Sequence, residues 1–439
     1  MTPPTTTESP RESPEPIPPS NDSAKTPRDA YAALRVRDFQ FLILSRFLAS
    51  LGEQMVGVAL GWQIYERTHS TLALGYIGLA EVLPVILLAL PAGHFSDRYD
   101  RRKIALITKM GLAACSLGFA ALTILHDPIW TFYLCIVVVG MTRAFHSPST
   151  STLLPQVVPI DLYESAATWM SNFWQLAAAL GPALGGAIIA VSRSAVPVYV
   201  LDGLFGMAFL VFISRIRGKA PPRERAAPTL YSLFEGVRFL YNNKILFSVI
   251  TLDLFAVLLG GAVTLLPVYA KDILKVGPVG LGWMRAAPAL GAVFMALSLA
   301  HLPPLKNAGR AMLLAVAGFG AATIVFGYST LFPLSLLMLL LLGAFDNISV
   351  VVRSTLMLIR VPDGMRGRIS AVNNIFIGAS NELGGFESGV AAHFLGPVLA
   401  VALGGVGTIV VVAAVAAIWP ELRQLKSLKI SIEEDLSTK

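Results

Sequence analysis

Apolar stretches, each close to 20 residues in length, recur along the whole chain and constrain its fold more than any other feature. A helix of about 20 residues, rising 1.5 Å per residue, matches the hydrocarbon core of a bilayer, which is about 30 Å thick. A backbone that crosses this core must satisfy its own hydrogen bonds, which only helices and closed barrels achieve. Because the stretches lack the alternation of barrel strands, the sequence predicts an all-α membrane protein.

We expect twelve membrane-spanning helices, at about residues 39–63, 72–94, 104–125, 130–152, 164–190, 196–214, 245–269, 280–300, 309–328, 331–353, 369–392 and 396–419. The composition agrees, since 55% of the residues are hydrophobic and 14% are charged, against about 25% charged residues in soluble domains. Residues 1–30 contain many Pro, Ser, Thr and Glu and few large apolar side chains, so they are expected to form a disordered cytoplasmic tail.

Lysine and arginine concentrate in alternate connections, which predicts the orientation of the chain in the membrane. They precede the first span, follow the second, fill the central connection and follow the last span, whereas the opposite loops contain few. Both termini are therefore expected in the cytoplasm. The net charge of +7 follows from this bias, so no nucleic-acid partner is expected.

The central connection, residues 217–244, divides the spans into two sets of six and contains an amphipathic stretch suited to a helix on the membrane surface. We expect six-helix bundles at residues 31–216 and 245–421 and a cytoplasmic tail at 422–439. Residue identities repeat between the halves at offsets of 203 or 204, as when Gly57 and Tyr65 correspond to Gly261 and Tyr269. This internal duplication predicts two related bundles with a binding site between them.

The duplication places charges of opposite sign at corresponding positions. Glu81 corresponds to Arg285, and Arg143 corresponds to Asp346. A lone charge deep in a bilayer costs at least about 2.5 to 3.5 kcal/mol, so these side chains should face the protein interior or a cavity. Two interpretations stay open: structural ion pairs, or groups that couple protons to a substrate.

Glu53 lies near the middle of the first span, with Arg46 two turns earlier on the same helix face. It is a candidate proton-binding carboxyl, although a simple ion pair with Arg46 is the alternative. Asp202 and Asp253 are expected to cap helices or to reach for the membrane surface. Of the acidic residues in the eleventh span, at most one is expected to line a cavity.

The loop after the second span resembles the signature loop of the major facilitator superfamily of secondary transporters. Its residues run from Gly93 through Asp97-Arg98 to Arg101-Arg102. The resemblance implies a conformational latch in which Asp97 sits against the start of helix 11 in the outward-facing state, where a helix N-terminus favours a carboxylate.

The fifth span contains small residues and a proline in a pattern similar to the antiporter motif of the superfamily, carried by Gly181, Pro182, Gly185 and Gly186. The glycines permit close helix contact and the proline removes a helical hydrogen bond. Within the superfamily the chain resembles the group that contains the enterobactin exporter, on segments 140–145, 265–267, 277–282 and 380–389. This resemblance implies a multi-pass protein of the bacterial inner membrane.

The chain has no Walker loop and no hydrolase or zinc motif, so neither an enzyme nor a cofactor or metal site is expected. The function expected is proton-coupled export of a small amphipathic molecule, such as a siderophore or drug, by a monomer. Import or facilitated diffusion, or a scaffold or receptor role without transport, are the alternatives. Candidate substrate-contacting residues are Trp62, Asn172, Gln175 and Asn373.

Overall fold

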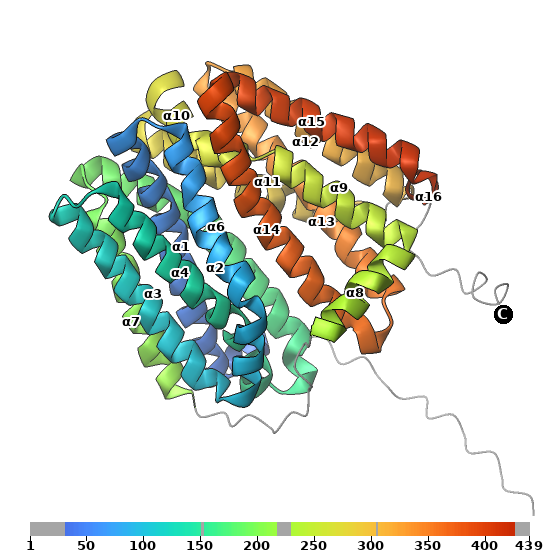
Figure 1. Cartoon of the computed structure of the whole chain (residues 1–439). Helices are drawn as coiled ribbons and strands as arrows, with labels where there is room; N and C mark the ends of the chain where they lie inside the picture. The colour runs from blue at the N-terminus through green and yellow to red at the C-terminus, as the bar shows by residue number, and fades with distance from the viewer. Residues whose placement is uncertain (1–30, 151–152, 217–229, 304–305, 426–439) are drawn as a thin grey trace, which may run out of the picture.

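The computed structural model describes residues 31–150, 153–216, 230–303 and 306–425. Every regular element in these ranges is a helix, which confirms the prediction of an all-α protein. The helices form two bundles that lie side by side (Figure 1).

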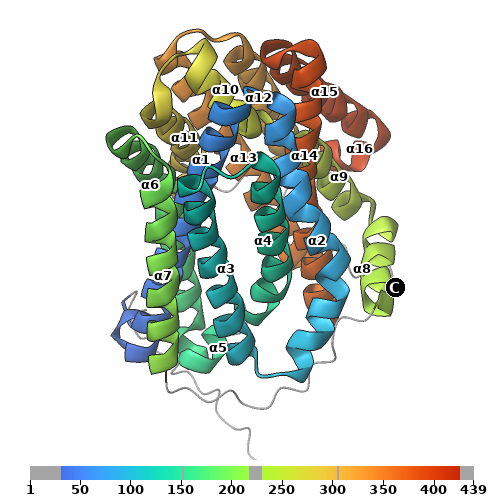
Figure 2. The same cartoon turned by 60° about the vertical axis from the view of Figure 1, so that its left-hand side comes forward.

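The N-terminal bundle contains six long helices and short connecting turns, and Figure 2 brings its helices α3, α4 and α7 forward. Its elements are η1 (Ala33–Arg35), α1 (Arg37–Thr68), α2 (Thr71–Arg98), α3 (Arg101–Ile124), α4 (Ile129–Thr150), α5 (Leu154–Val157), η2 (Ile160–Leu162), α6 (Tyr163–Ser192) and α7 (Val196–Arg215).

The C-terminal bundle also contains six long helices. Its elements are α8 (Leu230–Asn242), α9 (Lys244–Leu259), η3 (Ala262–Leu265), α10 (Leu266–Val268), the π-helical turn η4 (Tyr269–Ile273), α11 (Gly277–His301), α12 (Ala308–Tyr328), α13 (Phe332–Arg360), α14 (Asp363–Leu395), α15 (Pro397–Ile418) and α16 (Pro420–Gln424).

Eleven helices in the described ranges are long and apolar enough to cross a membrane. The remaining predicted span, residues 369–392, lies in α14, which has 33 residues but is too polar to count among the eleven. It nevertheless packs against α2 and α9 as a full member of the two-bundle arrangement (Figure 1). Two of its polar side chains, Ser380 and Ser388, are buried.

Polar side chains fix the starts of several helices. Ser70 accepts a hydrogen bond from the backbone N–H of Ala73 at the start of α2, and Asn243 accepts one from Leu246 at the start of α9. Asp100 accepts from the N–H of Arg102 at 2.9 Å and so begins α3. These side chains satisfy N–H groups that have no partner within the helix.

The two bundles approach each other most closely at the end of the helices where the turn after Thr68 joins α1 to α2, which we call the contact end. A methyl group placed on Gly389 of α14 would lie 2.6 Å from the Cα atom of Gly75 of α2. The hydroxyl of Tyr65 in α1 donates a hydrogen bond to Asp272 in η4. Bundle packing at this end therefore combines close glycine contacts, buried apolar side chains of both bundles and a polar contact.

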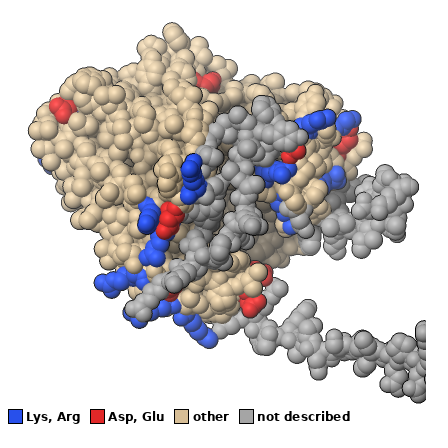
Figure 3. Space-filling model, turned by 60° about the horizontal axis from the view of Figure 1, so that its bottom comes forward, with Lys and Arg blue, Asp and Glu red and all other residues tan. Residues whose placement is uncertain are grey.

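The opposite end, which we call the α8 end, holds α8 and the start of α14. Leu240 of α8 is buried, and Arg368 of α14 forms an ion pair with Glu235 of α8. The ribbons of α2 and α14 diverge toward this end (Figure 1). Lysine and arginine side chains are more frequent than acidic ones on its surface (Figure 3).

Candidate functional site

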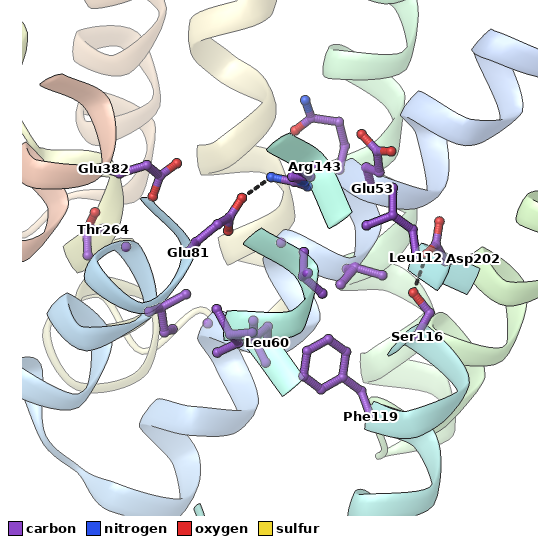
Figure 4. A pocket seen from close by; sticks show the side chains of 18 of the residues that line it. Glu53, Leu60, Glu81, Leu112, Ser116, Phe119, Arg143, Asp202, Thr264 and Glu382 are labelled. Carbon is purple, nitrogen blue, oxygen red and sulfur yellow. Dashed lines mark hydrogen bonds and ion pairs between the residues drawn. The ribbon is translucent and has the colours of Figure 1, made fainter. Parts of the chain in front are cut away.

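A cavity of about 410 Å³ lies inside the molecule between the two bundles. Most of its lining comes from α1, α2, α3, α4 and α7, and the C-terminal bundle contributes Thr264, Arg285 and Glu382. Six ionisable side chains line it, namely Glu53, Glu81, Arg143, Asp202, Arg285 and Glu382. Figure 4 labels all of them except Arg285. Such a concentration of charge within the membrane-spanning part of a protein points to a functional site.

Glu53 pairs with Lys109 of α3, whose Nζ donates to Glu53 Oε1 at 3.0 Å. The Lys109 side chain is only 1% exposed, so the carboxylate supplies the counter-charge that its burial requires. The alternative pairing of Glu53 with Arg46 is wrong: Arg46 lies outside the cavity lining and donates to the carbonyl of Thr150 at 3.1 Å. Lys109 was missed, although a lysine within the apolar run 104–125 was a visible signal.

Glu81 of α2 forms an ion pair with Arg143 of α4 at the cavity wall (Figure 4). The backbones are close here, because a methyl group placed on Gly140 would lie 2.3 Å from the carbonyl oxygen of Glu81. A glycine in α4 thus allows the two helices to approach and the pair to form. Both side chains face the cavity, as the depth of their positions in the sequence suggested.

Arg285 and Asp346, the counterparts of Glu81 and Arg143 in the second half of the chain, lie in two different places. Arg285 of α11 lines the cavity, and its Nη1 atom lies near Gly57 of α1. Asp346 of α13 does not line it, but faces a small separate space together with Asp253 and Ser349. Three of the four duplicated charges thus line the inter-bundle cavity, and Asp346 faces a separate space between α9, α12 and α13.

Asp202 and Asp253 are buried rather than placed at helix ends, so that expectation was wrong. Asp202 of α7 accepts a hydrogen bond from the Ser116 hydroxyl at 2.5 Å, and its carboxylate lies against the backbone of Gly52. Asp253 of α9 forms an ion pair with Arg353 of α13. Each aspartate has its partner on a neighbouring helix, which sequence position alone did not reveal.

Of the acidic residues in α14, Glu382 lines the cavity and Glu387 does not, in agreement with the expectation that at most one does. The Glu382 carboxyl lies near Gly78 of α2, where a built methyl group would be 3.1 Å from its Oε2 atom. Glu382 and Thr264 lie together on the cavity wall formed by the C-terminal bundle (Figure 4).

The residues of the expected latch lie at the α8 end of α2 and the start of α3. Gly93 and Arg98 belong to the last turns of α2, and Arg102 donates to the carbonyl oxygens of Ile213 and Ser214 at the end of α7. The side chains of Asp97 and Arg101 are outside the described side chains. In this structure Arg102 therefore joins helices of one bundle.

The glycines of the fifth predicted span pack α6 against two helices. Gly181 and Gly185 contact α1 near Gln54 and Met55. Gly186 faces α11 of the other bundle, where a methyl group would lie 2.3 Å from the Pro278 carbonyl oxygen. Pro182 is within α6, and its carbonyl oxygen lies near Gly282 of α11.

The four residues proposed to contact a substrate are not among those that line the cavity. Trp62 is buried and its ring lies 5.9 Å from Nζ of Lys271. Asn172 is exposed, while Gln175 and Asn373 are partly exposed. Within the described residues, no three His, Cys, Asp or Glu side chains are grouped so as to hold a metal ion.

The description "Transmembrane secretion effector" belongs to a family model of the major facilitator superfamily that matches residues 28–437. Enterobactin exporter EntS of Escherichia coli O1:K1 is 25% identical over 396 residues, which cover 88% of this chain and 93% of the exporter. The exporter of the same name from Shigella boydii serotype 18 matches with the same identity and coverage.

Solved transporters share the fold. The nucleoside transporter NupG, in a mutant form, superposes with a TM-score of 0.70 at 12% identity, covering 87% of this chain and all of that chain. The POT family transporter PepTSo gives 0.70 at 13% identity, covering 89% and 99%. A bacterial homologue of Spinster in an inward-facing, occupied conformation gives 0.67 at 14% identity, covering 88% and 96%.

Proposed function

Because the chain belongs to the transmembrane secretion effector family of major facilitator transporters, we propose that it exports a small amphipathic molecule across a bacterial inner membrane in exchange for protons. The family establishes a multi-pass membrane transporter, not an enzyme, with a small-molecule substrate. The direction, the coupling ion and the substrate are the proposal.

The observation that carries the proposal is the placement of ion pairs on the wall of an inter-bundle cavity. Glu53–Lys109 and Glu81–Arg143 each join two helices of the N-terminal bundle, and each contains a carboxyl that lines the cavity. A proton that binds a paired carboxylate removes its charge and releases the cation. Proton binding is thereby linked to the shape and charge of the space that a substrate occupies.

The packing supports alternating access. The bundles are in contact at the contact end, and the basic α8 end is the one expected in the cytoplasm. The described conformation then corresponds to an inward-facing state. Export requires a second state in which contacts such as Gly186 with Pro278 separate and the α8 end closes.

The substrate class follows the curated relatives, which are named enterobactin exporters. A cavity of this size with mixed polar and apolar walls is within the range for small ligands. Aromatic siderophores and amphipathic drugs are therefore the first compounds to test.

The test uses the full-length protein in proteoliposomes that contain a pH-sensitive dye. A panel of catecholate siderophores and aromatic drugs is screened for proton movement opposite to that of the solute. Glu53→Gln and Arg143→Ala should each abolish this coupled transport while the protein still inserts.

Glu66→Gln is the matched control, since Glu66 is an exposed acid on the same helix as Glu53 and lies outside the cavity lining. A double variant, Glu53→Gln with Lys109→Met, removes both charges together and separates coupling from the cost of leaving Lys109 unpaired. Wild-type rates in the double variant and in Arg143→Ala would exclude these residues from the coupling site.

A further inference from the structure

Arg285 differs from the other basic groups around the cavity because, within the described residues, no side chain forms a hydrogen bond or an ion pair with it. Among the described side chains, Lys109 pairs with Glu53, and Arg143 pairs with Glu81. Arg285 makes neither a hydrogen bond nor an ion pair, and its Nε atom is buried without an acceptor. A guanidinium always carries its charge, so this one needs an anion from another source.

The place of Arg285 shows where that anion would bind. The side chain extends from α11 across the bundle interface, and its Nη1 atom would lie 2.8 Å from a methyl group built on Gly57 of α1. Glycine at position 57 thus leaves room for the guanidinium at the cavity wall. The planar group of donors is directed into a space enclosed by both bundles.

Glu382 does not fill the role of this anion. It lines the same cavity and is close enough to Arg285 for the two charges to interact, but among the described side chains no hydrogen bond or ion pair joins them. Its carboxyl lies near Gly78 of α2, whereas the guanidinium lies near Gly57 of α1. The Glu382 carboxyl therefore leaves the guanidinium donors available for a paired hydrogen bond with a ligand.

We propose that Arg285 is a specificity-determining residue that selects an organic anion as the transported molecule. The acidic group of the ligand, such as a carboxylate, sulfonate or phosphate, accepts hydrogen bonds from the guanidinium. The apolar part of the ligand lies against Leu60, Ile77 and Phe119, which line the same cavity. This inference rests on the proposed transport function and adds the charge of the substrate to it.

The experiment compares two probes of the same skeleton, naphthalene-2-sulfonate and the neutral naphthalene-2-sulfonamide. Equilibrium dialysis measures their binding to the full-length protein in nanodiscs of uncharged lipid. Wild-type protein should bind the sulfonate more tightly, by roughly 10- to 100-fold, because a hydrogen bond to a charged group contributes about 1.5–3 kcal/mol.

Arg285→Gln should remove this preference while sulfonamide binding is kept, and Arg285→Lys should retain part of it because lysine keeps the charge but loses the planar pair of donors. The matched control is the double variant Asp253→Leu with Arg353→Met, at a buried ion pair outside the cavity lining. It removes a buried arginine of the same bundle along with its own anion, and the preference for the sulfonate should survive.

Equal affinity of wild-type protein for the two probes, or no binding of either at millimolar concentration, would overturn the proposal. So would an unchanged preference in Arg285→Gln. Two competition experiments test other sources of the anion. Displacement of the sulfonate by anionic lipid in the nanodisc would assign Arg285 to a lipid headgroup, and displacement by inorganic phosphate at equal concentration would assign it to an inorganic ion. Either result would refute the proposal.

The binding measurement requires no ion gradient, so its outcome is separate from that of the transport assay. Absence of proton-driven transport together with a sulfonate preference that depends on Arg285 would refute proton coupling and leave the anion site in place. Proton-driven export of neutral compounds alone would support proton coupling and refute the anion site.

Discussion

Replacing Gly186 with alanine adds one methyl group where α6 of the N-terminal bundle meets α11 of the C-terminal bundle. The new Cβ atom would lie 2.3 Å from the carbonyl oxygen of Pro278 and 3.0 Å from the Cα atom of Gly282. Carbon–oxygen contacts between packed helices are ordinarily about 3.3–3.6 Å. The two helices must therefore separate by about 1 Å at this point.

Overpacking of this kind costs about 1–3 kcal/mol, and the cost falls only on the conformation in which the contact end is closed. The equilibrium should shift toward an open contact end by about 5- to 150-fold. The change does not alter the contacts at the α8 end. The substitution therefore destabilises only the state of the transport cycle in which the contact end is closed.

The shift is measured by double electron–electron resonance between spin labels on Arg193→Cys and Thr330→Cys, at the contact end of the two bundles. The labelled protein also carries Cys115→Ala and Cys135→Ala, so that its own cysteines are not labelled. Gly186→Ala should increase the fraction of molecules in which the two spin labels are far apart. Gly378→Ala is the matched control, because a methyl group on that glycine meets no atom within 4 Å. The reasoning is refuted if Gly186→Ala gives the wild-type distance distribution, or if Gly378→Ala shifts it equally.

Three further predictions each concern one residue. Asp253→Asn leaves the charge of Arg353 without its partner at a place where both side chains are 8% exposed. It should therefore lower the free energy of unfolding by about 3–5 kcal/mol, measured as a lower thermal transition temperature in nanodiscs. The double variant Asp253→Leu with Arg353→Met should recover most of this loss, and an unchanged transition temperature in Asp253→Asn would contradict the argument. Tyr65→Phe removes the hydrogen bond to Asp272 between the bundles and should raise the open population in the same spin-label experiment by about tenfold or more, whereas no change would show that the contact does not hold the bundles together. Asp97→Asn, at the expected latch, should slow transport without weakening substrate binding, and an equal loss of both would argue against a latch.

The membrane spans were predictable because the information is local. The length of an apolar run fixes whether a helix crosses the bilayer, and charged groups such as Glu53 and Arg143 can be placed at depth by counting residues. Even α14, which is too polar to count among the eleven apolar helices, was recognisable from the length of its segment.

The partners of these charges were not predictable, because they depend on how helices rotate and pack. Lys109 is separated from Glu53 by 56 residues and comes from another helix, whereas Arg46 is nearby in sequence but turns toward the Thr150 carbonyl. Asp202 was interpreted from its distance to a helix end. Its actual surroundings are set by Ser116 of α3 and Gly52 of α1.

The duplication pairs charges of opposite sign in the two halves but does not say which of them meet. The cavity is built mostly from the N-terminal bundle. Arg143 therefore lines it and its counterpart Asp346 does not. A sequence repeat relates positions within each half and does not require that they meet.

The central claim is that the cavity lined by Glu53, Arg143 and Arg285 opens alternately to the two sides of the membrane. The most direct measurement places a single cysteine at Thr264, on the cavity wall, in a protein with Cys115→Ala and Cys135→Ala. A membrane-impermeant thiol reagent is then applied from either side of oriented vesicles. The cysteine should react from the α8 side at rest and become reactive from the other side in the Gly186→Ala background. Reaction from one side only under both conditions, or from neither, would contradict the account.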